Sequence, residues 1–123
     1  MNDQLMLTFD PVYIPALNLM YAADRYERAR IAKQAHKDIA WLVREQVETV
    51  ETYTVPVEIA IWAYGVQPRD VDASAKVILD GLVKAKVIAN DDWRHVPDCP
   101  LHTRKCQVGT ERIEVFITPL TGA

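Results

Sequence analysis

One stretch of the sequence, from about Ala23 to Val50, contains neither proline nor glycine and constrains the fold most strongly. Apolar residues recur along it at helical spacing, so it predicts a long amphipathic helix. These apolar positions are Ile31, Ala35, Ile39, Leu42 and Val43. The stretch also carries six of the 14 basic residues, namely Arg25, Arg28, Arg30, Lys33, Lys37 and Arg44. Acidic residues are interleaved with them, so a phosphate-tracking face and a solvated, salt-bridged surface both remain open.

The other predicted elements follow from β-branched runs, helical spacing and proline positions. Val71 to Lys86 is expected to form a second helix with an apolar face of Val71, Ala75, Ile78, Leu79 and Leu82. The expected strands are Leu5 to Phe9, Val55 to Val66, Trp93 to Val96 and Arg112 to Ile117, the last two forming a closing pair; Asp10 to Asn18 is a loop. This order predicts an α+β single domain over 1–123, with a small mixed β-sheet flanked by two main helices.

Length and composition describe an ordinary globular chain of 123 residues, 50% hydrophobic and 25% charged. The sequence has no charged-then-apolar leader and no apolar run approaching 18 residues, so neither a signal peptide nor a membrane span is expected. Two cysteines, Cys99 and Cys106, are too few for a disulfide scaffold and fit a reducing, cytoplasmic setting.

Acidic residues are concentrated in one region of the chain. Five of the 17 lie within residues 70–92, and setting them aside changes the formal net charge from −3 to +2. A bound divalent ion would offset this local acidity, so the net charge neither requires nor excludes a nucleic-acid partner. The five residues are Asp70, Asp72, Asp80, Asp91 and Asp92.

The spacing of these acids is compatible with a metal site. Asp70 and Asp72 stand two apart before the second helix, and in an extended linker both carboxylates face the same side. Lys76 follows Asp72 at helical spacing, and the Asp91-Asp92 pair lies beyond the helix, where the chain turns back. Clustered carboxylates repel one another, and Mg²⁺, which prefers oxygen ligands, relieves that repulsion.

The same acids also fit structural roles. Asp-x-Asp before a helix is typical of N-capping. Asp72, Lys76 and Asp80 also have the spacing of surface ion pairs, and Asn-Asp-Asp is ordinary turn sequence. Spacing alone therefore leaves both interpretations open.

The combined motifs resemble those of the RusA-type Holliday-junction resolvases. The family signature has an Asp-x-Asp, a Lys four residues on, an Asp-x-Leu further along the helix and a paired Asp after a short apolar stretch. The order of strands and helices is also similar along nearly the whole chain. The matching segments here are Ile14 to Asn18, Pro68 to Asp72, Lys76, Asp80-Gly81-Leu82 and Ile88 to Asp92.

This resemblance implies a Mg²⁺-dependent, homodimeric endonuclease that cleaves four-way DNA junctions, with Mn²⁺ as a substitute, in a bacterial cytoplasm whether host- or phage-encoded. It implies that Asp70, Asp72 and Asp92, with Asp91 as a further candidate, bind the metal, and that Lys76 assists catalysis. Asp80 is expected to support the site. Ala73 departs from the family pattern, which usually has Asn there, and its side chain cannot form a hydrogen bond. The expected DNA contacts are Asn18, Arg69, Lys76 and Arg94.

Two further features have competing interpretations. His95, Cys99, His102 and Cys106 have spacings that could suit zinc, but they match no well-known finger, and a loop between strands is preferred. Trp62 is expected to pack in the core. Trp41 lies off the apolar stripe, as a residue of a subunit interface would.

Overall fold

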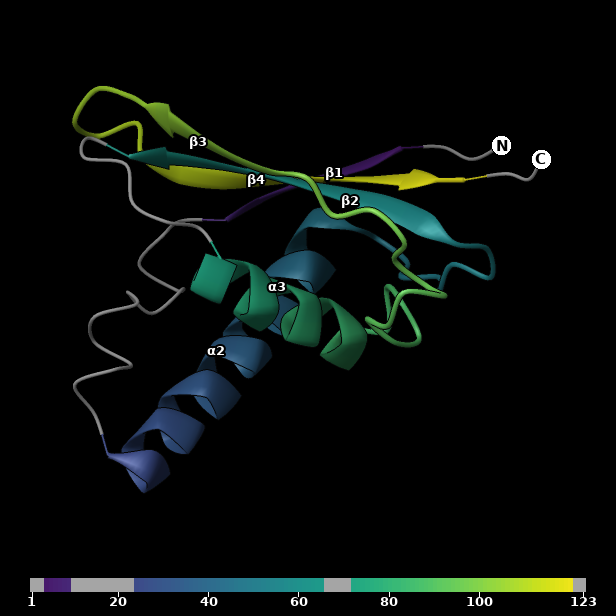
Figure 1. Ribbon diagram of the computed structural model, residues 1–123, viewed down its shortest axis with the longest axis horizontal. Helices are drawn as coiled ribbons and strands as arrows, with labels where there is room; N and C mark the ends of the chain where they lie inside the picture. Colours follow the sequence, from purple (N-terminus) through teal and green to yellow (C-terminus); the bar gives the residue numbers. More distant parts are fainter. Residues whose placement is uncertain (1–3, 10–23, 66–71, 121–123) are drawn as a thin grey trace.

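The computed structural model describes residues 4–9, 24–65 and 72–120. In these ranges the chain forms a four-stranded mixed sheet with two helices packed against one face (Figure 1). This architecture confirms the predicted α+β class. The elements in chain order are β1 (Leu5–Phe9), α2 (Arg25–Gln46), β2 (Val57–Gly65), α3 (Asp72–Lys84), β3 (Leu101–Lys105) and β4 (Arg112–Pro119).

The sheet has the strand order β1-β4-β2-β3 and two different faces. β4 runs antiparallel to both β1 and β2, whereas β3 runs parallel to β2. Side chains alternate across a strand. One set is buried beneath the helices: Leu7, Phe9, Val57, Ile59, Ile61, Ile113, Val115 and Ile117. The other set faces away from the helices, and Trp62 belongs to it, so the expectation that Trp62 packs in the core was wrong.

Helix α2 is shorter than predicted at both ends. Asp24 caps it, because its carboxylate accepts a hydrogen bond from the backbone N–H of Glu27 at 2.8 Å. Val47 has extended backbone angles and ends the helix, since the following residues do not continue it. The predicted apolar stripe is confirmed: Ala35, Ile39 and Val43 are buried, and Ile31 and Leu42 are partly buried.

Helix α3 ends in a turn that reverses the chain. Lys86 has a φ of +66°, in the left-handed region, and its N–H donates to the carbonyl of Val83. The N–H of Val87 donates to the carbonyl of Leu82, which completes a Schellman-type helix end. Val87 and Ile88 are then buried, and the chain runs back along the helix toward Asp91.

The predicted strand at Trp93 to Val96 was wrong. The N–H groups of His95 and Val96 both donate to the Asp92 carbonyl, so this segment is a tight turn. The strand begins after Pro100 instead, as β3. The predicted closing pair was also wrong, because β2 lies between β3 and β4. Alternation of residue types does not specify which strand is the neighbour of another.

The two helices pack closely against each other. Ala75, Ile78 and Leu82 of α3 are buried as predicted, whereas Leu79 is only partly buried. Gly81 allows the close approach, since a Cβ placed there would lie 2.6 Å from Cγ2 of Ile39. Within the described ranges, no helix combines the length and apolar character needed to cross a bilayer.

Candidate functional site

Lys76 of α3 and Asp91 of the returning turn are in direct contact. The Lys76 ammonium donates a hydrogen bond to Oδ2 of Asp91 at 3.0 Å. From Lys76 to Lys84 the helix rises about 12 Å, at 1.5 Å per residue. The five residues after Lys86 can span that distance, since five residues reach at most about 17 Å. The Schellman turn therefore positions Asp91 beside Lys76.

Asp80 is a second acidic neighbour of the same ammonium. Its Oδ1 is 3.3 Å from Nζ of Lys76, one helical turn earlier. Two carboxylates so close to one cation raise the pKa of Lys76, with the hydrogen bond to Asp91 contributing most. Lys76 therefore stays charged at neutral pH and acts as the counterion of both acids.

His36 of α2 extends this cluster, and sequence reasoning missed it. Its Nε2 is buried and lies 3.5 Å from Oδ2 of Asp80, too far for a hydrogen bond. The usable sequence signal was a histidine beside the apolar stripe, next to Ala35 and one turn before Ala40. The neighbouring helix that faces His36 is not evident from local sequence.

Asp92 takes a different partner from Asp91. Its Oδ1 lies 2.6 Å from Nδ1 of His95 and also accepts the backbone N–H of His95 at 3.1 Å. The side-chain hydrogen bond with His95 is the main reason that the pKa of Asp92 is lowered. Of the two neighbouring aspartates, Asp91 therefore contacts Lys76 and Asp92 contacts His95.

Several predicted site residues lie outside the described residues. These are Asn18, Arg69 and Asp70, while Asp72 and Ala73 are described only as the backbone of the first turn of α3. Among the side chains that are described, no group of three His, Cys, Asp or Glu residues is arranged to hold a metal ion. The described part of the predicted ligand set is therefore Asp91 and Asp92.

Trp93 and Arg94 form an exposed aromatic and basic pair directly after the two aspartates. The indole of Trp93 is 74% exposed, and the Arg94 guanidinium carbon lies 5.4 Å from the ring centroid. This stacking holds the Arg94 side chain against Trp93. Along the chain, the two residues directly follow Asp91 and Asp92. Arg94 was a predicted DNA contact, and it lies at the surface.

The residues with zinc-like spacing have separate surroundings. His95 contacts Asp92, whereas His102 of β3 stacks on Trp62 with ring centroids 3.9 Å apart. Cys99 and Cys106 are free thiols and partly buried, and burial raises the pKa of Cys99. Cys99 packs against the core, so its structural role is that of a small apolar residue.

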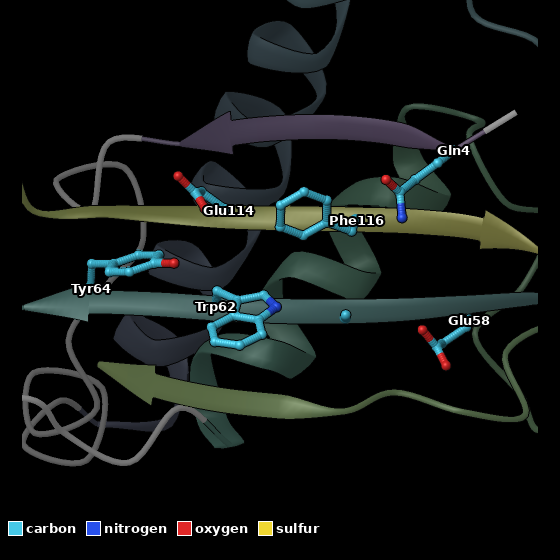
Figure 2. Close-up of a pocket in the computed structure, with 7 residues that line it drawn as sticks. Gln4, Glu58, Trp62, Tyr64, Glu114 and Phe116 are labelled. Atoms are coloured by element: carbon cyan, nitrogen blue, oxygen red, sulfur yellow. The ribbon is translucent and has the colours of Figure 1, made fainter. Parts of the chain in front are cut away.

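A pocket lies on the face of the sheet that turns away from the helices. It has a volume of about 410 Å³ and is open to solvent (Figure 2). Its walls come from alternate residues of β2 and β4, together with one residue next to β1. The lining residues are Gln4, Glu58, Ala60, Trp62, Tyr64, Glu114 and Phe116.

No family model matches the sequence, and a search of curated proteins gives no match.

Proposed function

We propose that this protein is a Mg²⁺-dependent endodeoxyribonuclease that resolves four-way DNA junctions by phosphodiester hydrolysis, in recombination and repair. The observation that carries the proposal is the 3.0 Å contact between Lys76 and Asp91. It joins two segments of the motif that are 15 residues apart, the helix and the paired aspartates. The resemblance to RusA-type resolvases implies this same grouping.

The donor chemistry of the site suits a hard cation. Asp91 presents carboxylate oxygens, the ligands that Mg²⁺ prefers, and Asp80 supports the site through Lys76. Bound Mg²⁺ would activate a water and stabilise the charge of the phosphodiester during hydrolysis. We propose that Asp70, Asp72 and Asp92 complete the ligand set, with Mn²⁺ as a substitute metal.

Lys76 supplies positive charge at the site. Its ammonium stays protonated because two carboxylates raise its pKa. Its side chain is 67% exposed, so a phosphate from solvent can reach it. A fixed cation beside a phosphate stabilises the negative charge that develops as the bond breaks.

DNA contacts would extend from this site over the nearby surface. Arg94 and Trp93 lie beside the aspartates, and α2 presents exposed basic residues such as Arg30, Lys33 and Lys37. Such groups bind phosphates, and contacts with phosphates carry little information about the base sequence. DNA shape would therefore determine specificity. We propose further contacts from Asn18 and Arg69.

Resolution of a junction requires two symmetric cuts. A homodimer with two-fold symmetry presents two equivalent sites to the two strands, which is the assembly that the family resemblance implies. We therefore propose a homodimer acting on branched DNA in the cytoplasm of a bacterial cell.

Two alternatives make different predictions. Ala73 and the net charge of −3 motivate the first, a DNA-binding or regulatory module that keeps the fold but cleaves weakly or not at all. The same chemistry could also act on other branched DNA.

Cleavage of labelled synthetic DNA tests the proposal. Wild type is incubated with a four-way junction, a fork and a duplex, in Mg²⁺, Mn²⁺ or EDTA. We expect metal-dependent cleavage of the junction in preference to the other two. Asp72→Asn and Asp91→Asn should each slow cleavage about 100-fold, the scale of losing one charge-stabilising group.

Asp38→Asn is the matched control, because Asp38 is an acid of α2 that accepts a hydrogen bond from Gln34. It should cleave as wild type does. Mg²⁺ should also raise the melting temperature of wild type more than that of Asp91→Asn, since a ligand that binds only the folded state stabilises it. Binding without cleavage in either metal supports the non-catalytic alternative, and preference for the fork supports the other.

A further inference from the structure

The face of the sheet that turns away from the helices is unusually aromatic. Trp62, Tyr64 and Phe116 lie on it, all partly exposed (Figure 2). His102 stacks on Trp62, and Met6 of β1 is 47% exposed beside Phe116 in the strand register. No element of the described chain covers this face (Figure 1).

A hollow lies next to the exposed indole. Ala60 is two residues before Trp62 on the same face of β2, and it is paired with Phe116 of β4. Because alanine is small, the space above it remains open and forms the middle of the 410 Å³ pocket. A large side chain and a cavity thus lie side by side on one strand.

The two ends of this face carry opposite charge. At one end, the guanidinium carbon of Arg104 lies 4.9 Å from the centroid of the Trp62 ring. The guanidinium carbon of Arg112 lies 3.9 Å from the centroid of the Tyr64 ring. At the other end lies Glu58, with Thr118 as its neighbour on β4. Glu114 lies between the two ends and forms a 2.8 Å ion pair with Arg112, so these two charges offset each other and the positive charge of the basic end comes mainly from Arg104.

We propose that this face binds a second copy of the same chain. The two sheets would pack face to face, about 10 Å apart as in β-sandwiches, with their β2 strands crossing in opposite directions. Trp62 of each copy then enters the hollow over the partner's Ala60. Glu58 meets the basic end of the other copy, formed by the partner's Arg104 and the partner's Arg112.

Charge selects this orientation over its alternative. A two-fold axis that lies across the strands places each acidic end on a basic end. An axis along the strands would place Arg104 and Arg112 on their own counterparts and Glu58 on itself, and such like-charge contacts cost energy. The distribution of charge along β2 and its neighbours is therefore self-complementary in one arrangement only.

The size of the face suits a weak dimer. The four strands are about 4.8 Å apart and five, nine, five and eight residues long, so they cover about 430 Å² before side-chain relief is added. Two such faces bury about 860 Å² before that relief, close to the roughly 1,000 Å² of the smallest specific interfaces.

Other surfaces and occupants fit less well. Trp41 of α2 is 62% exposed, but its neighbours one turn away are the charged residues Lys37, Asp38, Arg44 and Glu45, so it stands alone. Single-stranded nucleic acid could stack on the aromatic rings, but Glu58 lines the pocket and repels phosphate.

This inference specifies the surface of the homodimer in the proposed function. Its test measures mass and not cleavage, so a failed dimer and a failed nuclease give different results. Sedimentation equilibrium at micromolar concentrations should give wild type twice the 14.0 kDa mass of one chain.

Substitutions then locate the interface. Trp62→Ala should weaken dimerisation roughly 30-fold or more, as expected for an aromatic anchor at an interface centre. Trp41→Ala, an equal truncation on the helix, should leave it unchanged. Glu58→Arg and Arg104→Glu should each weaken dimerisation, and the double variant Glu58→Arg/Arg104→Glu should recover most of the loss. This recovery distinguishes lost contact from lost folding, and the circular dichroism spectrum of each variant checks the fold directly.

Three outcomes would overturn the proposal. Wild type could remain monomeric at these concentrations. The dimer could respond to Trp41→Ala but not to Trp62→Ala. A single-stranded oligonucleotide could quench Trp62 fluorescence in a protein that stays monomeric, which would assign the face to nucleic acid.

Discussion

At the scale of single residues, Lys76 connects the parts of the candidate site. It contacts Asp91 and Asp80, and through Asp80 it lies near His36. These ion pairs raise the pKa of Lys76 above its ordinary value of 10.5. They therefore stabilise the fold at pH values below 10.5, and this contribution disappears as the pH rises through the higher pKa of the folded state. The side chain is mostly exposed, so solvent screens the pairs and the contribution is at most about 1 kcal/mol.

Replacement of Lys76 tests its proposed catalytic role separately from its structural one. We expect Lys76→Met to slow junction cleavage about 100-fold, as loss of one charge-stabilising group does. The free energy of unfolding should change by less than about 1 kcal/mol, because the lost ion pairs are exposed. Cleavage rates and urea denaturation measure the two effects.

Lys84→Met is the control, since Lys84 is an exposed lysine in the last turn of the same helix. It should leave cleavage unchanged. Equal losses in both variants would mean that Lys76 contributes only general positive charge.

Part of the site could be predicted from sequence at this scale. The spacing of Asp72, Lys76 and Asp80 on one helix indicated that Lys76 would have acidic neighbours, and Asp80 is one of them. The choice between Asp91 and Asp92 could not be made, because it depends on the direction of the turn after α3. That turn directs Asp91 to Lys76 and Asp92 to His95.

At the scale of elements, the contact between α2 and α3 supports the site. It positions His36 opposite Asp80 and depends on the missing side chain at Gly81. A Cβ at that position would lie 2.7 Å from Cβ of Ile39, an atom that cannot rotate away. The helices would therefore have to separate.

Gly81→Ala tests this packing. Alanine favours a helix over glycine by about 1 kcal/mol. We nevertheless expect net destabilisation by about 1–3 kcal/mol, because the added methyl group overpacks the core. Thermal denaturation measures the change. Lys84→Ala, on the exposed side of α3, should stay within about 0.5 kcal/mol of wild type. A higher melting temperature for Gly81→Ala would show that the helices can adjust without cost.

The elements themselves were predicted to differing degrees. Both helices were found because a buried stripe imposes a regular period on many residues. The segment at Trp93 to Val96 failed because four residues carry little periodicity, and hydrogen bonds to Asp92 fold it into a turn. The position of β3 beside β2 was not predictable, since the pairing depends on contacts distant in sequence.

At the scale of the whole molecule, the fold has two layers that share one core. Residues of β1, β2 and β4 and of both helices contribute to a continuous buried cluster. A small domain of this kind unfolds as one unit, because neither layer retains a buried face without the other. The aromatic face of the sheet and the Lys76 cluster of the helical layer therefore belong to one cooperative structure.

Three tryptophans allow this cooperativity to be measured. Trp41 lies on α2, Trp62 on β2 and Trp93 in the turn after the paired aspartates. Three variants are compared, each of which retains only one of these tryptophans. Within each variant, fluorescence and circular dichroism should report the same urea midpoint at a fixed protein concentration. A lower midpoint for Trp41 fluorescence alone would mean that α2 detaches before the sheet unfolds.

The central claim is that the grouped acids and Lys76 hydrolyse branched DNA with a divalent metal. Incubation of the purified wild-type protein with an end-labelled four-way junction, in Mg²⁺ and in EDTA, measures this most directly. We predict paired, symmetric nicks near the junction centre in Mg²⁺ and intact strands in EDTA. A junction that is bound yet uncut in both Mg²⁺ and Mn²⁺ would contradict the claim.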